Sequence, residues 1–491
     1  MSSFSSLNLG ARAVFAAQRG LDITGQNIAN SATPGYSRQR VDQVAVGGPT
    51  VPAIWSKYDQ TGGGVKVTGV SRMRDEFLEA RGRYAHQSLG QYSETQKAYE
   101  AVERTVGEPS TTGLQTQLAD FWNAWGKIST QPSGQAAKAA RDLTFERTVG
   151  VANQFNRMSN QMTAQWNDTR AELSANIADV NAAAVDIAKL NRAIRNNVIN
   201  GLPANELADQ RDVLVEKVTS LTGGVAERDE DGMVSIKLAD NNRLVDGMFY
   251  RALATAGPAD KAARDVAAAS ARDVGVQWET DPAKSTLPVP APAAAHVLGV
   301  GTVTAELNTL NAIVPSYQDQ LDAIATQLMT VANAQHRSGY AENGSTNVDL
   351  FTLSPGTGGV AGRIVVNPSV KADTLAVSSV NPTTPDANGI KTFNGDNAKD
   401  MSYHLNDPDG ADAQFRSMVT RLGVEAQSIY RNQSAAEKVA KTADDARDAV
   451  SGVSLNEEMT NLMKYQHSFE AAAKFITAVD ATIESLLSMT R

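Results

Sequence analysis

Residues 3–30, SFSSLNLGARAVFAAQRGLDITGQNIAN, decide the fold, because they place apolar side chains at alternating spacings of three and four residues. This spacing is typical of one apolar stripe along an α-helix. Residues 455–487 repeat it near the C-terminus, with polar interruptions at Gln466 and Asp480. The first stripe consists of Phe4, Leu7, Ala11, Val14, Leu21 and Ile28, and the second of Leu455, Met459, Leu462, Phe469, Ala473, Ile476, Ile483 and Leu487.

Each terminal helix needs a partner, because a single helix cannot bury its own apolar stripe. The matching stripes predict that the two ends pair as a coiled coil, with the rest of the chain inserted between them. Ordering the backbones of the two ends costs conformational entropy, and the contact between two helices gains free energy only from burial of its own side chains. We therefore expect loose ends in the free monomer, which neighbouring copies cover in an assembly.

Further helices are predicted between the ends. In the first of them an apolar stripe is clearest from Phe155 to Val198, and in the third Pro315 predicts a kink or the true start of the helix. The predicted helical segments are residues 92–199 with breaks near Pro109 and Pro132, a helix after Pro203 that ends at Gly223-Gly224, residues 307–331 and residues 411–450.

Short strands are predicted at residues 234–238, 363–366 and 375–377, from alternation or from β-branched runs. The fold class is therefore mainly α with smaller β parts (α+β). We expect three domains: a terminal coiled-coil assembly domain of residues 1–60 plus 451–491, a discontinuous, mainly helical domain of residues 61–223 plus 300–450, and an inserted, variable β-rich domain of residues 224–299.

Composition argues against several functional classes. The 491 residues carry 45 Lys+Arg against 54 Asp+Glu, a net charge of -9, and no basic block that could follow a phosphate backbone, so nucleic acid is not an expected partner. The absence of cysteine excludes disulfides, thiolate metal sites and cysteine nucleophiles. The five histidines form no HExxH motif, and no phosphate-binding glycine loop is present. No catalytic, cofactor or metal site is predicted, although distant carboxylate pairs stay open.

Membrane insertion and ordinary secretion are not expected either. The N-terminus lacks a basic start followed by an apolar stretch and a cleavage site. The longest charge-poor segment, residues 285–305, contains three prolines and two glycines, which disqualifies it as a spanning helix.

The segment from Asn27 to Gln39, NIANSATPGYSRQ, ends the first helix in a defined way. Thr33 precedes a proline and is biased out of the helical region, and Pro34-Gly35 favours a type II turn that reverses the chain. On these grounds alone, the segment could be no more than a helix stop followed by a turn.

Residues 21–30 and 33–36 resemble the N-terminal signature shared by bacterial flagellar rod, hook and hook-associated proteins. The continuation Tyr36-Ser37-Arg38-Gln39 looks like the hook-associated protein 1 family in particular. The residues that carry this turn motif are Asn27, Asn30, Thr33, Pro34, Gly35 and Tyr36.

Two further segments resemble the same family. Residues 205–212, NELADQRD, look like its central Asp-Gln-Arg-Asp element, and residues 452–474 are similar to its terminal helix almost throughout. The resemblance does not reach residues 252–295, where this family varies most. Residues 8–10, Asn-Leu-Gly, depart from the Ser-Gly-Leu-like pattern that is common in its members.

The resemblance implies a structural component of the flagellum, not an enzyme, that forms the junction between hook and filament by self-assembly through its terminal helices. It implies export by the flagellar type III system without a cleaved signal, and a location outside the cell. The implied partners are other copies of the chain, the hook protein, a second junction protein and an export chaperone on the C-terminal helix. The expected assembly interface is Phe4, Leu7, Val14, Leu21, Ile28, Leu455, Met459, Leu462, Phe469, Ile476, Ile483 and Leu487.

Three alternatives stay open from the sequence. A hook or rod component shares the N-terminal motif but is opposed by residues 36–39 and 209–212. An axial protein with cell-wall hydrolase activity is a second alternative. An adhesive or antigenic outer part at residues 252–295, in addition to the junction role, is the third.

Overall fold

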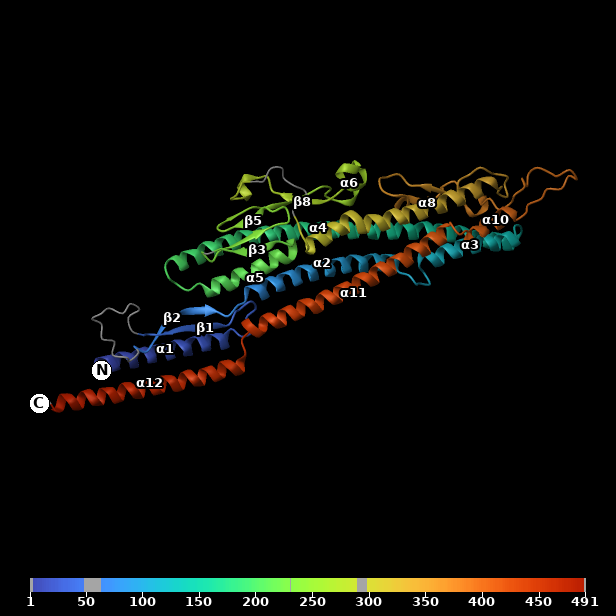
Figure 1. The fold of residues 1–491 in the computed structure, drawn as a ribbon. Coiled ribbons are helices and arrows are strands. Elements are labelled where there is room, and N and C mark those ends of the chain that lie inside the picture. Colours follow the sequence, from blue (N-terminus) through green and yellow to red (C-terminus); the bar gives the residue numbers. More distant parts are fainter. Residues whose placement is uncertain (1–2, 48–62, 230, 289–297, 490–491) are drawn as a thin grey trace.

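The two ends of the chain lie side by side at one end of an elongated, mostly helical molecule (Figure 1). The computed structural model describes residues 3–47, 63–229, 231–288 and 298–489. There α1 (Ser3–Ala29) packs along α12 (Leu455–Met489), with both termini at the same outer end. The predicted pairing of the terminal helices is therefore confirmed.

The contact between α1 and α12 depends on small residues of α1. A methyl group at Gly20 would lie 2.5 Å from the ring of Tyr465, and one at Gly10 would lie 2.6 Å from Cγ1 of Ile476. Glycine therefore allows the two helices to approach closely at these points. The buried positions of α1 are Gly10, Ala16, Ala17, Gly20, Ile23, Thr24 and Asn27.

A β-hairpin covers α1 on another side. Strand β1 (Gln39–Ala45) pairs antiparallel with β2 (Val65–Arg72), with a register shift between Asp42 and Gln43. Both strands contact α1. Residues 65–72 therefore lie beside the terminal helices, on the far side of the boundary that the sequence suggests at residue 60.

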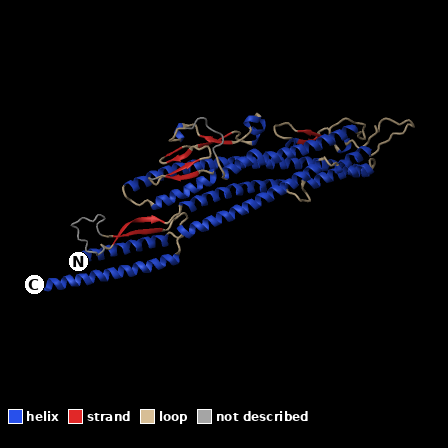
Figure 2. Ribbon diagram, viewed as in Figure 1, coloured by secondary structure: helices blue, strands red, loops and turns tan. Residues whose placement is uncertain are grey.

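Long helices form the body of the molecule, where α11 runs alongside α2 and is joined to α12 by a short connection that displaces the two helices sideways (Figures 1 and 2). Asp75 caps the start of α2, and Gly107, with a φ of 61°, ends it. The predicted breaks near Pro109 and Pro132 are confirmed. The body helices are α2 (Glu76–Val106), α3 (Leu114–Thr130), α4 (Gln135–Ile199), α5 (Asn205–Thr222), α7 (Thr302–Asn308), α8 (Val314–Ser338), α9 (Val360–Arg363), α10 (Asp396–Tyr403) and α11 (Ala411–Ser451).

The main hydrophobic core follows the predicted stripe of α4. Phe155 and Trp166 are fully buried, together with Trp125 of α3 and Phe415 of α11. Val198, at the end of the predicted stripe, is instead 49% exposed. It lies in the last turn of α4, beyond the point at which the neighbouring elements cover the helix.

Pro315 changes the helical geometry without separating the predicted third helix into two distant parts. Because proline has no backbone N–H, it cannot donate to the carbonyl four residues earlier. The chain instead passes through a π-helical turn at Thr309–Ile313, where Val314 N–H donates to the carbonyl of Thr309.

Small antiparallel sheets lie beside α4 and α5, between α5 and α7 in the sequence (Figure 2). They contain the strand predicted at residues 234–238 and two strands from the segment that the family resemblance did not reach. Residues 289–297 of the predicted insertion lie outside the described residues. The elements are β3 (Val225–Arg228), β4 (Val234–Lys237), β5 (Arg243–Asp246) and β6 (Phe249–Tyr250) in one sheet, β7 (Leu253–Ala256) with β8 (Gly275–Trp278), and the short helix α6 (Lys261–Val266).

One predicted strand is wrong. The run of residues 363–366 contributes β10 (Ile364–Val366), which pairs with β9 (Phe351–Leu353), but residues 375–377 form no strand. Side chains satisfy the backbone there: Ala376 N–H donates to Nε2 of His336 at 3.1 Å, and its carbonyl accepts from Nδ2 of Asn397 at 2.6 Å. The β-branched run is extended and buried without needing a neighbouring strand.

Within the described ranges, none of the helices has the length and apolar character that crossing a bilayer requires.

The Gly20 contact gives a test of the terminal pairing. We expect Gly20→Ala to cost about 1–3 kcal/mol by overpacking against Tyr465, so backbone amides of α12 should exchange hydrogen about tenfold faster or more. Hydrogen–deuterium exchange measured by mass spectrometry checks this.

Gly25→Ala is the matched control, because a methyl group at Gly25 meets no described atom within 4 Å. It should preserve or increase protection, since alanine favours a helix by about 1 kcal/mol over glycine. Adding Tyr465→Ala to Gly20→Ala should restore part of the protection. Equal exchange in the two glycine variants would contradict the close contact.

Candidate functional site

Three segments that carry the family resemblance meet in space, although they lie far apart in the sequence. They are the turn segment at residues 26–39, the start of α5 at residues 205–212, and the start of α12 at Glu457 and Glu458. We call this region the motif junction. It joins the terminal helix pair to the body of the molecule.

Asn27 lies at the centre of the motif junction and is 1% exposed. Its Nδ2 group donates to the carbonyl of Gln39 at 2.9 Å and to Oε2 of Glu458 at 3.1 Å. Its Oδ1 atom accepts from the Tyr36 hydroxyl at 2.9 Å and from Gln39 N–H at 3.0 Å. The amide has two donors and two acceptor positions, so this buried side chain is fully satisfied.

The turn predicted at Pro34-Gly35 is confirmed. Tyr36 N–H donates to the carbonyl of Thr33 at 3.2 Å, and Gly35 has a φ of 78°, as the third residue of a type II turn requires. A methyl group at Gly35 would also collide with the side chain of Val213. Asn30 supports the turn, because its Nδ2 group donates to the carbonyl of Gln26 and its Oδ1 atom accepts from the Thr33 hydroxyl.

Arg38 ties the turn segment to the last helix. Its guanidinium contacts Oε1 of Glu458 at 2.7 Å and Oε2 of Glu457 at 2.6 Å. Its backbone N–H donates to the carbonyl of Ser451, at the end of α11. The break between α11 and α12 is therefore held against the turn segment by backbone and side-chain bonds.

The start of α5 binds the same turn segment from the other side. The carboxylate of Asp209 accepts from the backbone N–H of Ser37 at 3.1 Å and from its hydroxyl at 2.8 Å. Asn205 donates to Oε1 of Gln39 at 3.1 Å, and Glu206 accepts from Gln26 at 2.9 Å. The motif at residues 205–212 is therefore not only the charged beginning of a helix; it also binds the turn segment through side-chain hydrogen bonds.

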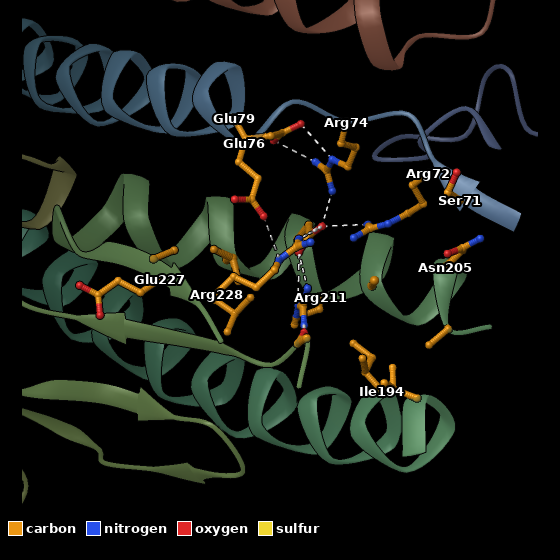
Figure 3. A pocket seen from close by; sticks show the side chains of 18 of the residues that line it. Ser71, Arg72, Arg74, Glu76, Glu79, Ile194, Asn205, Arg211, Glu227 and Arg228 are labelled. Atoms are coloured by element: carbon orange, nitrogen blue, oxygen red, sulfur yellow. Dashed lines mark hydrogen bonds and ion pairs between the residues drawn. The ribbon is translucent and has the colours of Figure 1, made fainter. Parts of the chain in front are cut away.

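Arg72, Arg74, Arg211 and Arg228 lie together beside this contact, in a pocket of about 570 Å³ (Figure 3). Asp212 also lines this pocket. Arg72, from the end of β2, bridges Asp209 and Asp212 at 2.8 and 2.9 Å, and Arg74 also pairs with Asp212. Burial tends to raise the pKa of Asp212, but the charges of Arg211, Arg74 and Arg72 outweigh it and hold the pKa below its ordinary value. The carboxylate therefore stays ionised and keeps its arginine partners.

Burial also acts on Tyr36. It raises the pKa of this hydroxyl to about 12, with further contributions from the negative charges of Asp209, Glu206 and Glu458. The hydroxyl therefore remains protonated and can donate its hydrogen bond to Asn27.

The residues predicted for an assembly interface fall into two groups in the free chain. One group lies half-buried along the helix pair, and the other is exposed; the side chain of Phe4 lies outside the described residues. The half-buried group is Leu7, Val14, Leu21, Ile28, Leu462, Ile476 and Ile483, and the exposed group is Leu455, Met459, Phe469 and Leu487.

Sequence reasoning missed the polar partners that hold the motif junction together. It gave no role to Arg38, Glu458, Asp209 or Arg72. The one sequence feature that could have indicated such a partner is Glu458, a charged residue next to the apolar stripe of α12. Glu458 is 1% exposed and forms an ion pair with Arg38, which lies near the N-terminal end of the chain.

Asn27→Ala tests the centre of the motif junction. The variant leaves buried groups of Gln39 and Glu458 without partners, at a cost of about 2 kcal/mol or more. We expect trypsin cleavage after Arg38 to accelerate at least about 30-fold. Asn30→Ala is the control, because Asn30 is half-buried and has fewer partners. Similar cleavage rates for both variants would contradict the role of Asn27.

Tyr36→Phe tests the raised pKa. A folded-state pKa above the ordinary value of 10 means that the contribution of Tyr36 to stability is complete below pH 10 and is lost as the pH rises through about 12. The difference between the alkaline absorbance titrations of the parent chain and the variant isolates this one hydroxyl. We expect its midpoint near pH 12, and a midpoint near pH 10 would show an exposed, unbonded tyrosine.

The chain is similar in sequence to known proteins. The family model described as "Flagellar hook-associated protein FlgK helical domain" matches residues 99–351, and that described as "Flagellar basal body rod FlgEFG protein C-terminal" matches residues 447–489. Flagellar hook-associated protein 1 of Bacillus subtilis is 30% identical, over 99% of this chain and 98% of that protein. The protein of the same name from Escherichia coli is 23% identical, over 99% of this chain and 100% of its own length.

A solved structure shares the fold. The flagellar hook junction protein FlgK from Burkholderia pseudomallei has a TM-score of 0.60 and 14% sequence identity, and the match covers 77% of this chain and 100% of that chain. Together with the identity over the whole length and the match of the helical domain, this likeness leads to one conclusion: the chain belongs to the flagellar hook-associated protein 1 (FlgK) family.

Proposed function

We propose that this protein forms the junction between the hook and the filament of the bacterial flagellum, by self-assembly through α1 and α12. Its membership of a family of structural hook-associated proteins supports a place in the flagellum. The observation that carries the proposal further is the apolar side of α12, which stays exposed after α1 has packed against it.

The exposed side of α12 is the surface that we assign to neighbouring copies. Met459, Met463 and Phe469 are 49, 51 and 36% exposed, and Leu455 is 52% exposed. Burial of a large apolar side chain contributes about 1.5–3 kcal/mol. Exposed apolar patches commonly mark interaction surfaces, so a neighbouring terminal helix pair that covers these residues supplies a driving force for assembly.

The proposal of an export chaperone depends on the same exposed side of α12. Before assembly, the exposed apolar side of α12 is prone to aggregation, and we propose that an export chaperone covers it. Export through the flagellar type III system requires a readily unfolded chain, and a chain without cysteine forms no disulfide that resists unfolding. We propose the hook protein and a second junction protein as neighbours in the flagellum.

We propose that the chain has three regions with different roles. The terminal helices with the β1–β2 hairpin would form the assembly region, with a boundary near residue 75 in place of residue 60, because β2 pairs with β1. The long helices would form the body, and residues 224–299 would form a variable insertion. The break at Gly452 between α11 and α12 would mark the return to the assembly region.

We propose a structural role without catalysis. A zymogram on purified cell wall tests this directly, and clearing by the intact protein would favour the alternative of a wall hydrolase.

Three substitutions on the exposed side of α12 test the assembly surface: Met459→Ser, Met463→Ser and Phe469→Ser together. The free chain should stay folded, because these side chains are already exposed. We expect the variant, as the only copy in a strain, to give hooks without filaments and flagellin in the medium. Electron microscopy and immunoblotting of the medium measure both.

Thr460→Ser, Lys464→Ser and His467→Ser form the control, because these exposed polar positions of α12 face away from the three apolar residues. This variant should carry normal filaments. Normal filaments from the apolar variant would contradict the assembly surface. If a strain that lacks this protein makes no hooks, the protein would instead belong to the hook or the rod.

A further inference from the structure

Three glutamates from three helices meet away from the motif junction. Glu94 belongs to α2, Glu172 to α4 and Glu306 to α7. One carboxylate oxygen of each lies within 4.8 Å of the corresponding oxygens of the other two. The terminal helices and the motif junction use none of the three.

Glu306 is fully buried, with 0% of its surface exposed. Its Oε1 atom accepts a hydrogen bond from Nδ2 of Asn176 at 2.5 Å, whereas its Oε2 atom is buried without a hydrogen-bond partner among the described residues. Buried polar atoms are nearly always satisfied by protein, water or an ion. The Oε2 atom therefore points to a ligand at this place.

The surrounding charge points to a cation. Lys97 donates to Oε2 of Glu94 at 2.7 Å and lies 4.0 Å from Glu172, so it neutralises only one of the three carboxylates. Burial, followed by the charge of Glu94, raises the pKa of Glu306 to about 8. Either a proton or a cation must therefore relieve the repulsion among the three groups.

We propose that Glu94, Glu172 and Glu306 bind a hard divalent cation, such as Ca²⁺ or Mn²⁺. Carboxylate oxygens alone favour cations of this class over zinc or copper, which prefer nitrogen and sulfur ligands. After Lys97 has neutralised one carboxylate, two negative charges remain for a divalent ion. Waters would complete the coordination shell.

Two of the three glutamates lie at a pocket. Glu94, Lys97 and Glu172 line an open pocket of about 560 Å³ between α2 and α4. Ligands from three helices also give binding a structural effect, because the ion would join α2, α4 and α7 directly. Bound cation should therefore raise the thermal stability of the chain in a concentration-dependent way.

The test uses the full chain in metal-free buffer, titrated with MnCl₂ while electron paramagnetic resonance measures free Mn²⁺. We expect one bound Mn²⁺ per chain, displaced by excess Ca²⁺. Glu306→Gln keeps the size of the buried side chain and should weaken binding at least about tenfold. Glu172→Gln should do the same, and because Glu172 is exposed, this variant keeps the test valid if the first one fails to fold.

Asp168→Asn is the matched control, because Asp168 lines the same pocket but does not belong to the group of three. It should bind Mn²⁺ as the parent chain does. Absence of binding by the parent chain would overturn the proposal and leave a proton shared by Glu306 and a neighbouring carboxylate. Undiminished binding by Glu306→Gln and Glu172→Gln would overturn it as well.

Discussion

The amide of Asn27 is the constraint on which the rest of the structure depends. A buried amide costs free energy unless both its donors and its acceptor are satisfied, so its four partners must be in place together. Those partners come from the turn segment, the start of β1 and the start of α12. One side chain therefore requires the first helix, the turn and the last helix to be assembled in a single arrangement.

Such a constraint gives the helices a defined relative orientation, which apolar packing alone does not provide. Burial of apolar surface is non-directional, and two helices with matching stripes can slide or rotate with little loss. The pairs of Arg38 with Glu458 and of Ser37 with Asp209 have fixed geometry, and breaking either would remove one of the hydrogen-bonding partners of a buried carboxylate. The motif junction therefore fixes the direction in which the terminal helices leave the body.

The sequence predicted the helical body well, because long periodic stripes and proline breaks are local signals. Phe155 and Trp166 mark the core of α4 by spacing alone, and Gly223 marks the end of α5. Predictions failed where a side chain replaced a backbone partner, as at Ala376, which bonds to His336 instead of to a strand. The site was only half predictable: Asn27 and Tyr36 were found as a motif, but a pairing such as Arg38 with Glu458 spans 420 residues and leaves no local pattern.

The terminal helices also meet at small residues that a stripe of large apolar side chains does not predict. Gly10 and Gly20 allow a close approach between α1 and α12, so the helices meet over small residues at these points. Large side chains such as Met459 and Phe469 then remain at the outer side of the pair. A helix pair that buried all its large residues internally would have little left with which to bind neighbouring copies. Close packing over glycine leaves those side chains exposed, as the proposed contacts between subunits require.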